Sequence, residues 1–306
     1  MKQKSKLSTL NTVLSVVLVI CLVATVLMVA LKPAATALSG EETQEEVDVA
    51  VIDEFTAGTY GGVEFKSQED VLNYYAEAYN KTKAQTQEYV LDSGDTVTWY
   101  SMLGEEDLQV KNIMIEGKEN ATINKLVPGI VGGLFTKGSC GLSPSSNRQP
   151  QDDVDENGQS LTTCLLTADD LVAANVTDKG DGTVELKLQP KDVNMSHRGM
   201  DAQGKLFNTL GAIDATVDSI TVLSWASGTT AENCLVNYKG GYATVVIDTA
   251  TGLITTADYH MEAHITVNHA NVTVIKDKSA NVLVTYDVHY PASAEYLKEA
   301  VAATAK

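Results

Sequence analysis

Arginine is almost absent from this chain of 306 residues, in which Arg148 and Arg198 are the only two. Asp and Glu outnumber Lys and Arg by 40 to 22, so the formal net charge at neutral pH is −18. A protein that binds nucleic acid needs clustered cationic side chains against the phosphates. The composition therefore argues against a nucleic-acid partner and suits a domain that repels its own copies at a surface.

The sequence also lacks the short motifs of the common enzyme classes. It has no G-x-S-x-G, no P-loop, no G-x-G-x-x-G and no H-E-x-x-H. Ser139 and Cys140, in a glycine-rich stretch, come nearest to an exposed nucleophile, but the sequence places no base beside them. We therefore expect a protein that is not an enzyme and that needs no cofactor.

Cysteines are too few and too irregular for a disulfide scaffold. Cys21 lies in a hydrophobic run, which leaves Cys140, Cys164 and Cys234, an odd number without a C-x-x-C pair. Two interpretations stay open. One bridge forms, either Cys140 to Cys164 or Cys164 to Cys234, or all three are small buried hydrophobic side chains.

One uncharged run, residues 13–31, is long enough to cross a bilayer as a helix. Lysines precede this run and acidic residues follow it, so the positive-inside rule predicts a cytoplasmic N-terminus and an external remainder. We expect a short cytoplasmic tail over 1–9 and a single-pass membrane anchor over 10–32. The small-x-small pattern Ala35-Thr36-Ala37 leaves a second reading open, in which the run is a signal peptide and the protein is secreted after cleavage following Ala37.

The rest of the chain divides into a linker and one domain. Residues 33–59 are acidic and poor in large apolar side chains, which predicts a linker that does not fold. Residues 60–306 are enough for a single extracytoplasmic domain. Within it, a stretch at about 125–165 is rich in Gly, Pro and Ser and has no sustained period, which predicts a long loop.

Hydrophobic periodicity predicts two amphipathic helices, 67–84 and 203–217, and a short helix after Pro291. Ser67 and Asp70 form a capping-box-like start for the first helix. Strands are expected at 88–91, 96–103, 108–115, 184–188, 220–225, 234–238, 242–248, 253–267, 272–275 and 282–290. We expect the first three strands to be neighbours, and we expect chain reversals at 239–241 and 276–279. The predicted class is α+β, with a large antiparallel sheet, flat or curved into a half-barrel, packed on the two helices.

A calcium-loop pattern occurs in the middle stretch. Asp153, Asp155 and Asn157 supply oxygen ligands at positions 1, 3 and 5, and Gly158 follows at position 6. The pattern then departs from an EF-hand, because position 12 is Cys164 instead of Glu and no predicted helices flank the loop. These three residues are candidate calcium ligands, and a solvated acidic loop is the reading that we favour.

A second candidate site lies on a predicted strand. His260, Glu262 and His264 alternate with other residues, so all three side chains should point to one face of the sheet. Two of them could share a metal only with help from a neighbouring strand, which His269 or His289 could supply. A half-exposed strand with a polar outer face explains the same alternation, and we favour that explanation.

Three stretches carry a resemblance to known proteins: SQEDVLNYYAEAYNKTKA, LTADDLVAANVTDKGDGTVELKL and ATVVIDTATGLITTADYHMEAHITV. With the anchor and the acidic spacer, they resemble exported, membrane-anchored proteins of Gram-positive bacteria, a group without defined functional residues. The layout is also similar to the LolA and LppX type of lipoprotein carrier, in which a curved antiparallel sheet encloses a hydrophobic cavity. This chain departs from that type because it has no lipobox and has a glycine-rich middle.

The resemblance implies a non-enzymatic binding module on the outer face of the membrane, which holds an apolar or amphiphilic ligand between sheet and helices. The middle loop would then act as a lid. The alternative is an envelope interaction module with a filled core, which contacts another surface protein through its loops. Both readings predict the same alternating strands, because an inward face looks alike whether it packs on side chains or on a ligand.

Overall fold

The computed structural model describes residues 52–100, 104–119, 163–192, 202–207, 218, 223–272 and 275–304. The expected tail, the anchor, the cleavage site at Ala37 and most of the acidic linker lie outside these ranges, as does most of the middle loop. Among the described residues, no helix has both the length and the apolar character needed to cross a membrane.

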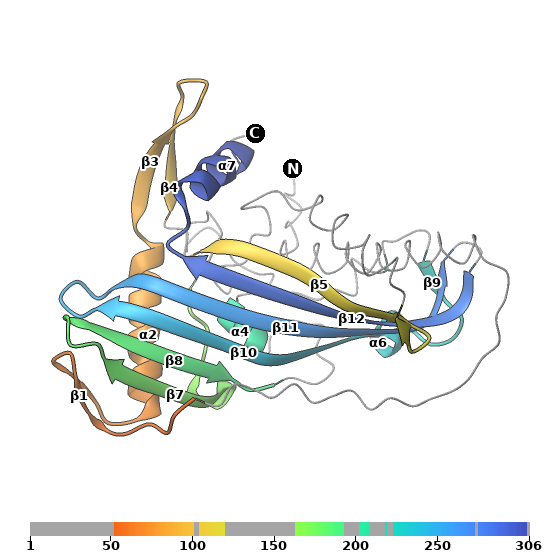
Figure 1. Cartoon of the computed structure of the whole chain (residues 1–306), viewed down its shortest axis with the longest axis horizontal. Helices are drawn as coiled ribbons and strands as arrows, with labels where there is room; N and C mark the ends of the chain where they lie inside the picture. The colour runs from red at the N-terminus through yellow and green to blue at the C-terminus, as the bar shows by residue number, and fades with distance from the viewer. Residues whose placement is uncertain are drawn as a thin grey trace, which may run out of the picture.

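An antiparallel sheet of eight strands forms the centre of the described fold (Figure 1). Its strands are β5 (Glu105–Ile115), β6 (Lys118–Glu119), β7 (Leu171–Asp178), β8 (Thr183–Pro190), β9 (Leu223–Trp225), β10 (Cys234–Asp248), β11 (Leu253–Val272) and β12 (Ile275–Tyr290). Seven of them follow the order β6-β5-β12-β11-β10-β8-β7, and β9 pairs with the far end of β11. Together with the few helices, this sheet confirms the predicted α+β class.

The helix α2 (Gln68–Lys83) packs across one face of the sheet, next to β7, β8 and β11 (Figure 1). Ser67 caps it with the reciprocal Ser67–Asp70 capping box that the sequence predicts. Its buried stripe recurs at helical spacing: Val71, Leu72, Tyr75, Ala78 and Tyr79. Burial of such a large apolar side chain contributes about 1.5–3 kcal/mol relative to exposure, so this stripe attaches the helix to the sheet.

Side chains fill the space between α2 and the sheet. Alternate residues of the central strands point into this core, and the residues between them form the opposite face. Tyr75 of α2 and Tyr259 of β11 are both fully buried, and the Tyr75 hydroxyl donates a hydrogen bond of 3.2 Å to the Tyr259 hydroxyl. Burial raises the pKa of both phenols, so both hydroxyls stay protonated in the core.

Both predicted reversals inside the strand-rich C-terminal half are wrong. Residues 239–241 do not turn the chain, because β10 continues through them with an irregularity between Lys239 and Tyr242. Gly240 has φ +62°, a left-handed backbone conformation that glycine adopts without steric strain. The strand therefore accommodates the bulge and continues in the same direction. The segment 276–279 lies inside β12, which pairs with β11 from Val272↔Ile275 onwards. The turn residues there belong to a continuous strand.

The predicted first hairpin forms but does not join the central sheet. Strands β3 (Thr86–Val90) and β4 (Thr96–Tyr100) pair with each other in a separate two-stranded sheet, whereas β5 pairs with β12. The expectation that these three strands are neighbours is therefore wrong for β5. A further two-stranded sheet joins β1 (Gly58–Tyr60) to β2 (Val63–Phe65).

The C-terminal helix α7 (Ala294–Thr304) follows Pro291 as predicted and packs on the β3–β4 hairpin. Figure 1 shows the hairpin and this helix together at one end of the sheet. Trp99 of β4 forms a second small core with Tyr296, Ala300 and Val301 of α7. This second core gives the hairpin a partner other than the central sheet, which explains its separate position.

Shorter helices complete the described part. The second predicted amphipathic helix is described only as α4 (Ala202–Phe207), and the rest of 203–217 lies outside the described residues. Its Lys205 forms an ion pair of 2.9 Å with Asp170, which belongs to the 3-10 turn η2 (Ala168–Asp170). Helix α6 (Thr230–Asn233) leads directly into β10.

Cys164 and Cys234 are free thiols, so the bridge between them that the sequence left open is not formed. Cys234 is buried at the start of β10, and Cys164 is half-buried beside α2, where its backbone N–H donates to the Asn80 side chain. Burial raises the pKa of Cys164 to about 11 and that of Cys234 to about 12. Both thiols therefore stay protonated at neutral pH and pack as small apolar groups. Cys140 lies outside the described residues.

Candidate functional site

A cavity of about 320 Å³ lies where the hairpin β3–β4, the start of α7 and one end of the central sheet meet. We call it the junction cavity. It is lined by Thr82, Gln85, Thr86, Gln87, Tyr89, Trp99, Leu253, Ile254, Tyr290, Pro291, Ala292 and Leu297. The volume falls at the lower end of the 300–1,000 Å³ range of small-molecule pockets.

The end of α2 fixes one wall of the junction cavity to the sheet. The hydroxyl of Thr82, on the last turn of α2, donates to the Ala78 carbonyl at 2.7 Å and accepts from the Ile254 N–H at 2.9 Å. Thr82 and Ile254 are both buried. This pair of bonds holds the first residues of β11 against the helix, and the hairpin begins directly after the helix ends.

The lining of the junction cavity is aromatic and polar but uncharged. No Asp, Glu, Lys, Arg or His is among its lining residues. Trp99 is 3% exposed, and its indole Nε1–H has no hydrogen-bond partner. A buried donor without a partner costs about 1–3 kcal/mol. The Nε1 atom has almost no accessible surface, so this donor is buried in the second core and is not open to a ligand in the cavity.

The phenols of Tyr89 and Tyr290 line the same cavity. Burial raises the pKa of the Tyr89 phenol, and the neighbouring Tyr290 phenol adds to this shift. The Tyr89 hydroxyl donates to the Gln87 Oε1 atom at 3.3 Å, and the Gln85 Nε2 atom donates to the Lys81 carbonyl at 3.2 Å. These bonds leave the Gln87 amide N–H groups and the Gln85 carbonyl oxygen to other partners.

Sequence reasoning missed the junction cavity. Its lining comes from α2, β3, β4, β11, β12 and α7, which are distant along the chain and carry no spacing motif. One signal was present: Tyr89 and Trp99 lie on the two strands of a predicted hairpin that is too small to bury both rings by itself.

A second set of polar residues occupies the face of the sheet opposite α2, on β11 and β12. Each of the four histidines in the described residues pairs there with a carboxylate: His260 with Asp287, His264 with Glu262, His269 with Asp277, and His289 with Asp258. We call this set the histidine face. Two of its pairs, Asp258↔His289 and His260↔Asp287, lie directly opposite in the β11–β12 register. Polar side chains that pair at such positions stabilise strand pairing by about 0.2–1 kcal/mol per pair.

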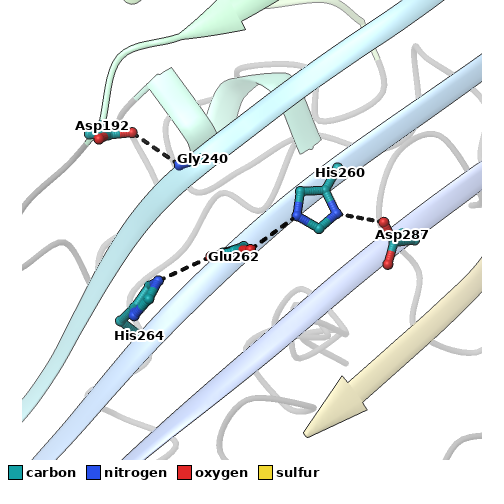
Figure 2. A network of polar contacts seen from close by, with 6 residues as sticks. All are labelled: Asp192, Gly240, His260, Glu262, His264 and Asp287. Carbon is teal, nitrogen blue, oxygen red and sulfur yellow. Dashed lines mark hydrogen bonds and ion pairs between the residues drawn. The ribbon is translucent and has the colours of Figure 1, made fainter. Parts of the chain in front are cut away.

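Figure 2 shows His260 between two carboxylates of this face, Glu262 and Asp287. Its Nδ1 atom is 2.5 Å from the Asp287 Oδ1 atom, its Nε2 atom is 3.4 Å from the Glu262 Oε1 atom, and its ring stacks on Tyr242 with centroids 5.2 Å apart. The hydrogen bond to Asp287 raises the pKa of His260, although partial burial opposes this shift. Figure 2 also shows Glu262 between the two imidazoles, with its Oε2 atom 3.2 Å from the His264 Nε2 atom.

The structure confirms that His260, Glu262 and His264 share one face of the sheet, but it does not bring them together as metal ligands. Glu262 separates the two imidazoles, and His269 and His289 pair with carboxylates of their own. The described ranges contain no group of three or more His, Cys, Asp or Glu residues suited to a metal ion.

The candidate calcium ligands Asp153, Asp155 and Asn157 lie outside the described residues, as do Ser139 and Cys140. Comparison of the chain with protein-family models, with curated proteins and with solved structures finds no match.

Proposed function

We propose that this protein is a non-enzymatic binding module on the outer face of a cell membrane, and that it holds a small ligand in the junction cavity. The supporting observation is the junction cavity itself, which Tyr89, Trp99 and Tyr290 help to line with aromatic rings. Well-formed cavities with apolar walls and a few convergent polar groups are the usual sites of small-molecule binding. The external location rests on the charge pattern around the N-terminal hydrophobic run.

The proposed ligand is apolar or amphiphilic, as in a LolA-type carrier, but its binding site differs from the one in such a carrier. In such a carrier the ligand lies between the sheet and the helices that cover it. Here the side chains of α2 and of the sheet pack together in one large core cluster. The junction cavity lies instead at the end of the sheet, beside the second core.

The test is to purify the whole chain in amphipol, record its native mass, and extract it for small molecules. The matched control is Ala292→Trp, which fills the cavity from a half-buried lining position. We expect a stoichiometric small molecule in the wild type that is absent from the variant, because lipid bound around a membrane segment would be common to both. A ligand-free mass, together with no binding of a fluorescent apolar probe, would contradict the proposal.

One observation favours the alternative, an envelope protein-interaction module with a filled core. The β3–β4 hairpin stands clear of the central sheet (Figure 1), and Val90 on it is 73% exposed. An exposed strand with large apolar side chains can contact another protein. Binding to a purified surface protein that is lost in Val90→Lys but kept in Ala292→Trp would support this alternative.

A further inference from the structure

The histidine face contains a row of four side chains in which carboxylates and imidazoles alternate. Asp287 contacts His260, His260 contacts Glu262, and Glu262 contacts His264 (Figure 2). The exposed fractions of the last three side chains lie between 14% and 18%. A carboxylate with so little access to water needs a donor or a cation to offset its lost hydration. The partners of Glu262 therefore determine where its side chain lies.

Both ring nitrogen atoms of His260 face carboxylate oxygens. The Nδ1 atom is 2.5 Å from Asp287 Oδ1, and the Nε2 atom is 3.4 Å from Glu262 Oε1. An ionised carboxylate only accepts hydrogen bonds, and a neutral imidazole has only one N–H group. Only the imidazolium form of His260 donates to both carboxylates, so the observed arrangement belongs to protonated His260. The hydrogen bond to Asp287, which raises the pKa of His260, favours the same form.

Loss of the His260 proton leaves Glu262 with one donor fewer. The shorter contact to Asp287 keeps the remaining N–H group on Nδ1. The bare Nε2 atom then faces the Glu262 Oε1 atom, and two acceptors repel each other. The His264 Nε2 atom, 3.2 Å from Glu262 Oε2, is the one donor left in the row. Neutral His260 therefore favours a turn of the half-buried carboxylate toward another cation.

Lys239 of β10 is the cation within reach. It lies directly opposite Glu262 in the β10–β11 register, where Cβ atoms are about 4.5–5.5 Å apart. The carboxyl group of Glu262 already leans over β10, because a Cβ atom added to the neighbouring Gly240 would lie 3.8 Å from the Glu262 Cδ atom. Among the described residues, Lys239 is paired with no carboxylate. A short rotation of Glu262 thus brings it to an unused ammonium group.

The other charged groups around His260 offer Glu262 no such partner. In the part of the chain that the structure describes, the titratable groups that face this region come from β11, β12, β10 and β5 and from the end of β8: Asp258, Glu262, His264, Asp287, His289, Lys239, Tyr242, Asp107 and Asp192. Asp258 is paired with His289, and Asp192 accepts from the Gly240 N–H at 3.1 Å. Lys239 is the only lysine in this set.

We propose that Glu262 is a pH-dependent switch, which bridges His260 and His264 when His260 is protonated and turns to Lys239 when His260 is neutral. Acid then frees the Lys239 ammonium group, and alkali pairs it. Proton binding on β11 thus controls a positive charge that the neighbouring strand presents on the histidine face. This inference goes beyond the proposed function and does not depend on the junction cavity.

The experiment follows the histidine side chains of the whole chain in amphipol by NMR, with EDTA present to remove metal ions. Selective labelling gives signals from only five histidines, and His260→Gln and His264→Gln assign the two that matter. The titration runs from about pH 5 to about pH 9, around the usual range of histidine. We expect the His264 signal to change at the midpoint of the His260 titration, because the Glu262 bridge opens there. Glu262→Gln should abolish this linked change.

A double-mutant cycle tests the alternative partner. Lys239→Met keeps the aliphatic stem but removes the cation that competes for Glu262, so proton binding by His260 should tighten about threefold. In the Glu262→Gln background the same substitution should have no effect, because no carboxylate is left to turn. The matched control is Lys111→Met, which removes the same charge from the same face but lies opposite Leu283. It should leave the His260 titration unchanged. Circular dichroism checks the folding of each variant.

The results decide between a switch and simple electrostatics. An effect of Lys239→Met that requires Glu262, together with the linked His264 change, supports the switch. An equal effect in both backgrounds shows that Lys239 acts only through its charge and overturns the inference, as does no effect in either. A His264 signal that does not respond at the His260 midpoint also overturns it. This last result comes from the wild type alone, so a variant that fails to fold does not remove the test.

Discussion

Thr82 joins the end of α2 to the start of β11, and its replacement by valine tests how much that connection contributes. Valine has nearly the shape of threonine but no hydroxyl, so Thr82→Val leaves the buried Ile254 N–H without an acceptor. An unsatisfied buried N–H costs about 1–3 kcal/mol. The added methyl group recovers at most about 0.8 kcal/mol of hydrophobic stabilisation. We therefore expect Thr82→Val to lower the free energy of unfolding by about 1–2 kcal/mol.

Urea unfolding followed by circular dichroism measures this difference, and Thr82→Ser is the matched control. Serine keeps the hydroxyl that accepts from Ile254 and loses only a methyl group, so its destabilisation should be smaller than that of valine. Hydrogen exchange of the Ile254 amide gives a local readout and should be faster in Thr82→Val than in Thr82→Ser. Equal stability of the valine variant and the wild type, or equal destabilisation by the two substitutions, would refute the reasoning.

Three further predictions concern other parts of the fold. Gly104→Ala would place a Cβ atom 1.8 Å from the Cγ1 atom of the buried Val288, so the Val288 side chain or the backbone beside it must move, and thermal unfolding should show a loss of about 1–3 kcal/mol. Ser67→Ala removes the helix cap of α2 and should cost about 1 kcal/mol in urea unfolding, whereas Ser67→Asp, which also caps helices, should cost less. Folding raises the pKa of His260 above its unfolded value near 6.5. The pair of His260 with Asp287 therefore stabilises the folded state fully below the unfolded pKa, and this stabilisation is lost as the pH rises through the folded-state pKa. The wild type should thus exceed Asp287→Asn in stability most clearly near pH 6, and a stability difference that does not change between pH 6 and pH 9 would contradict this assignment.

Local patterns predicted much of the fold. The apolar stripe and the capping residues at Ser67 and Asp70 were enough for α2, since both act within a few residues of each other. Alternating apolar side chains were enough for most of the strands and for the antiparallel class. The same alternation placed His260, Glu262 and His264 on one face, because successive side chains of a strand point to opposite faces.

Turn-forming residues were a poorer guide in the long strands. Gly240 and Gly241 suit a turn, yet β10 passes through them, because its pairing with β11 on both sides stabilises more than a reversal would. The separation of β5 from the first hairpin likewise depends on a competing partner. β12 offers β5 a long antiparallel edge, and α7 offers the hairpin an apolar face. The residues around the hairpin and β5 in the sequence include neither β12 nor α7, so local patterns could not predict these contacts.

The sequence by itself determined most of the periodic elements and the α+β class, because both follow from the pattern of neighbouring residues. Only the tertiary structure decided which residues meet at the junction cavity, where Thr82, Trp99 and Tyr290 come together from separate elements. It also decided which carboxylate each described histidine contacts. The physical reason is the same in both cases. A site is built from contacts between segments far apart in the chain, and the packing of whole strands and helices sets those contacts.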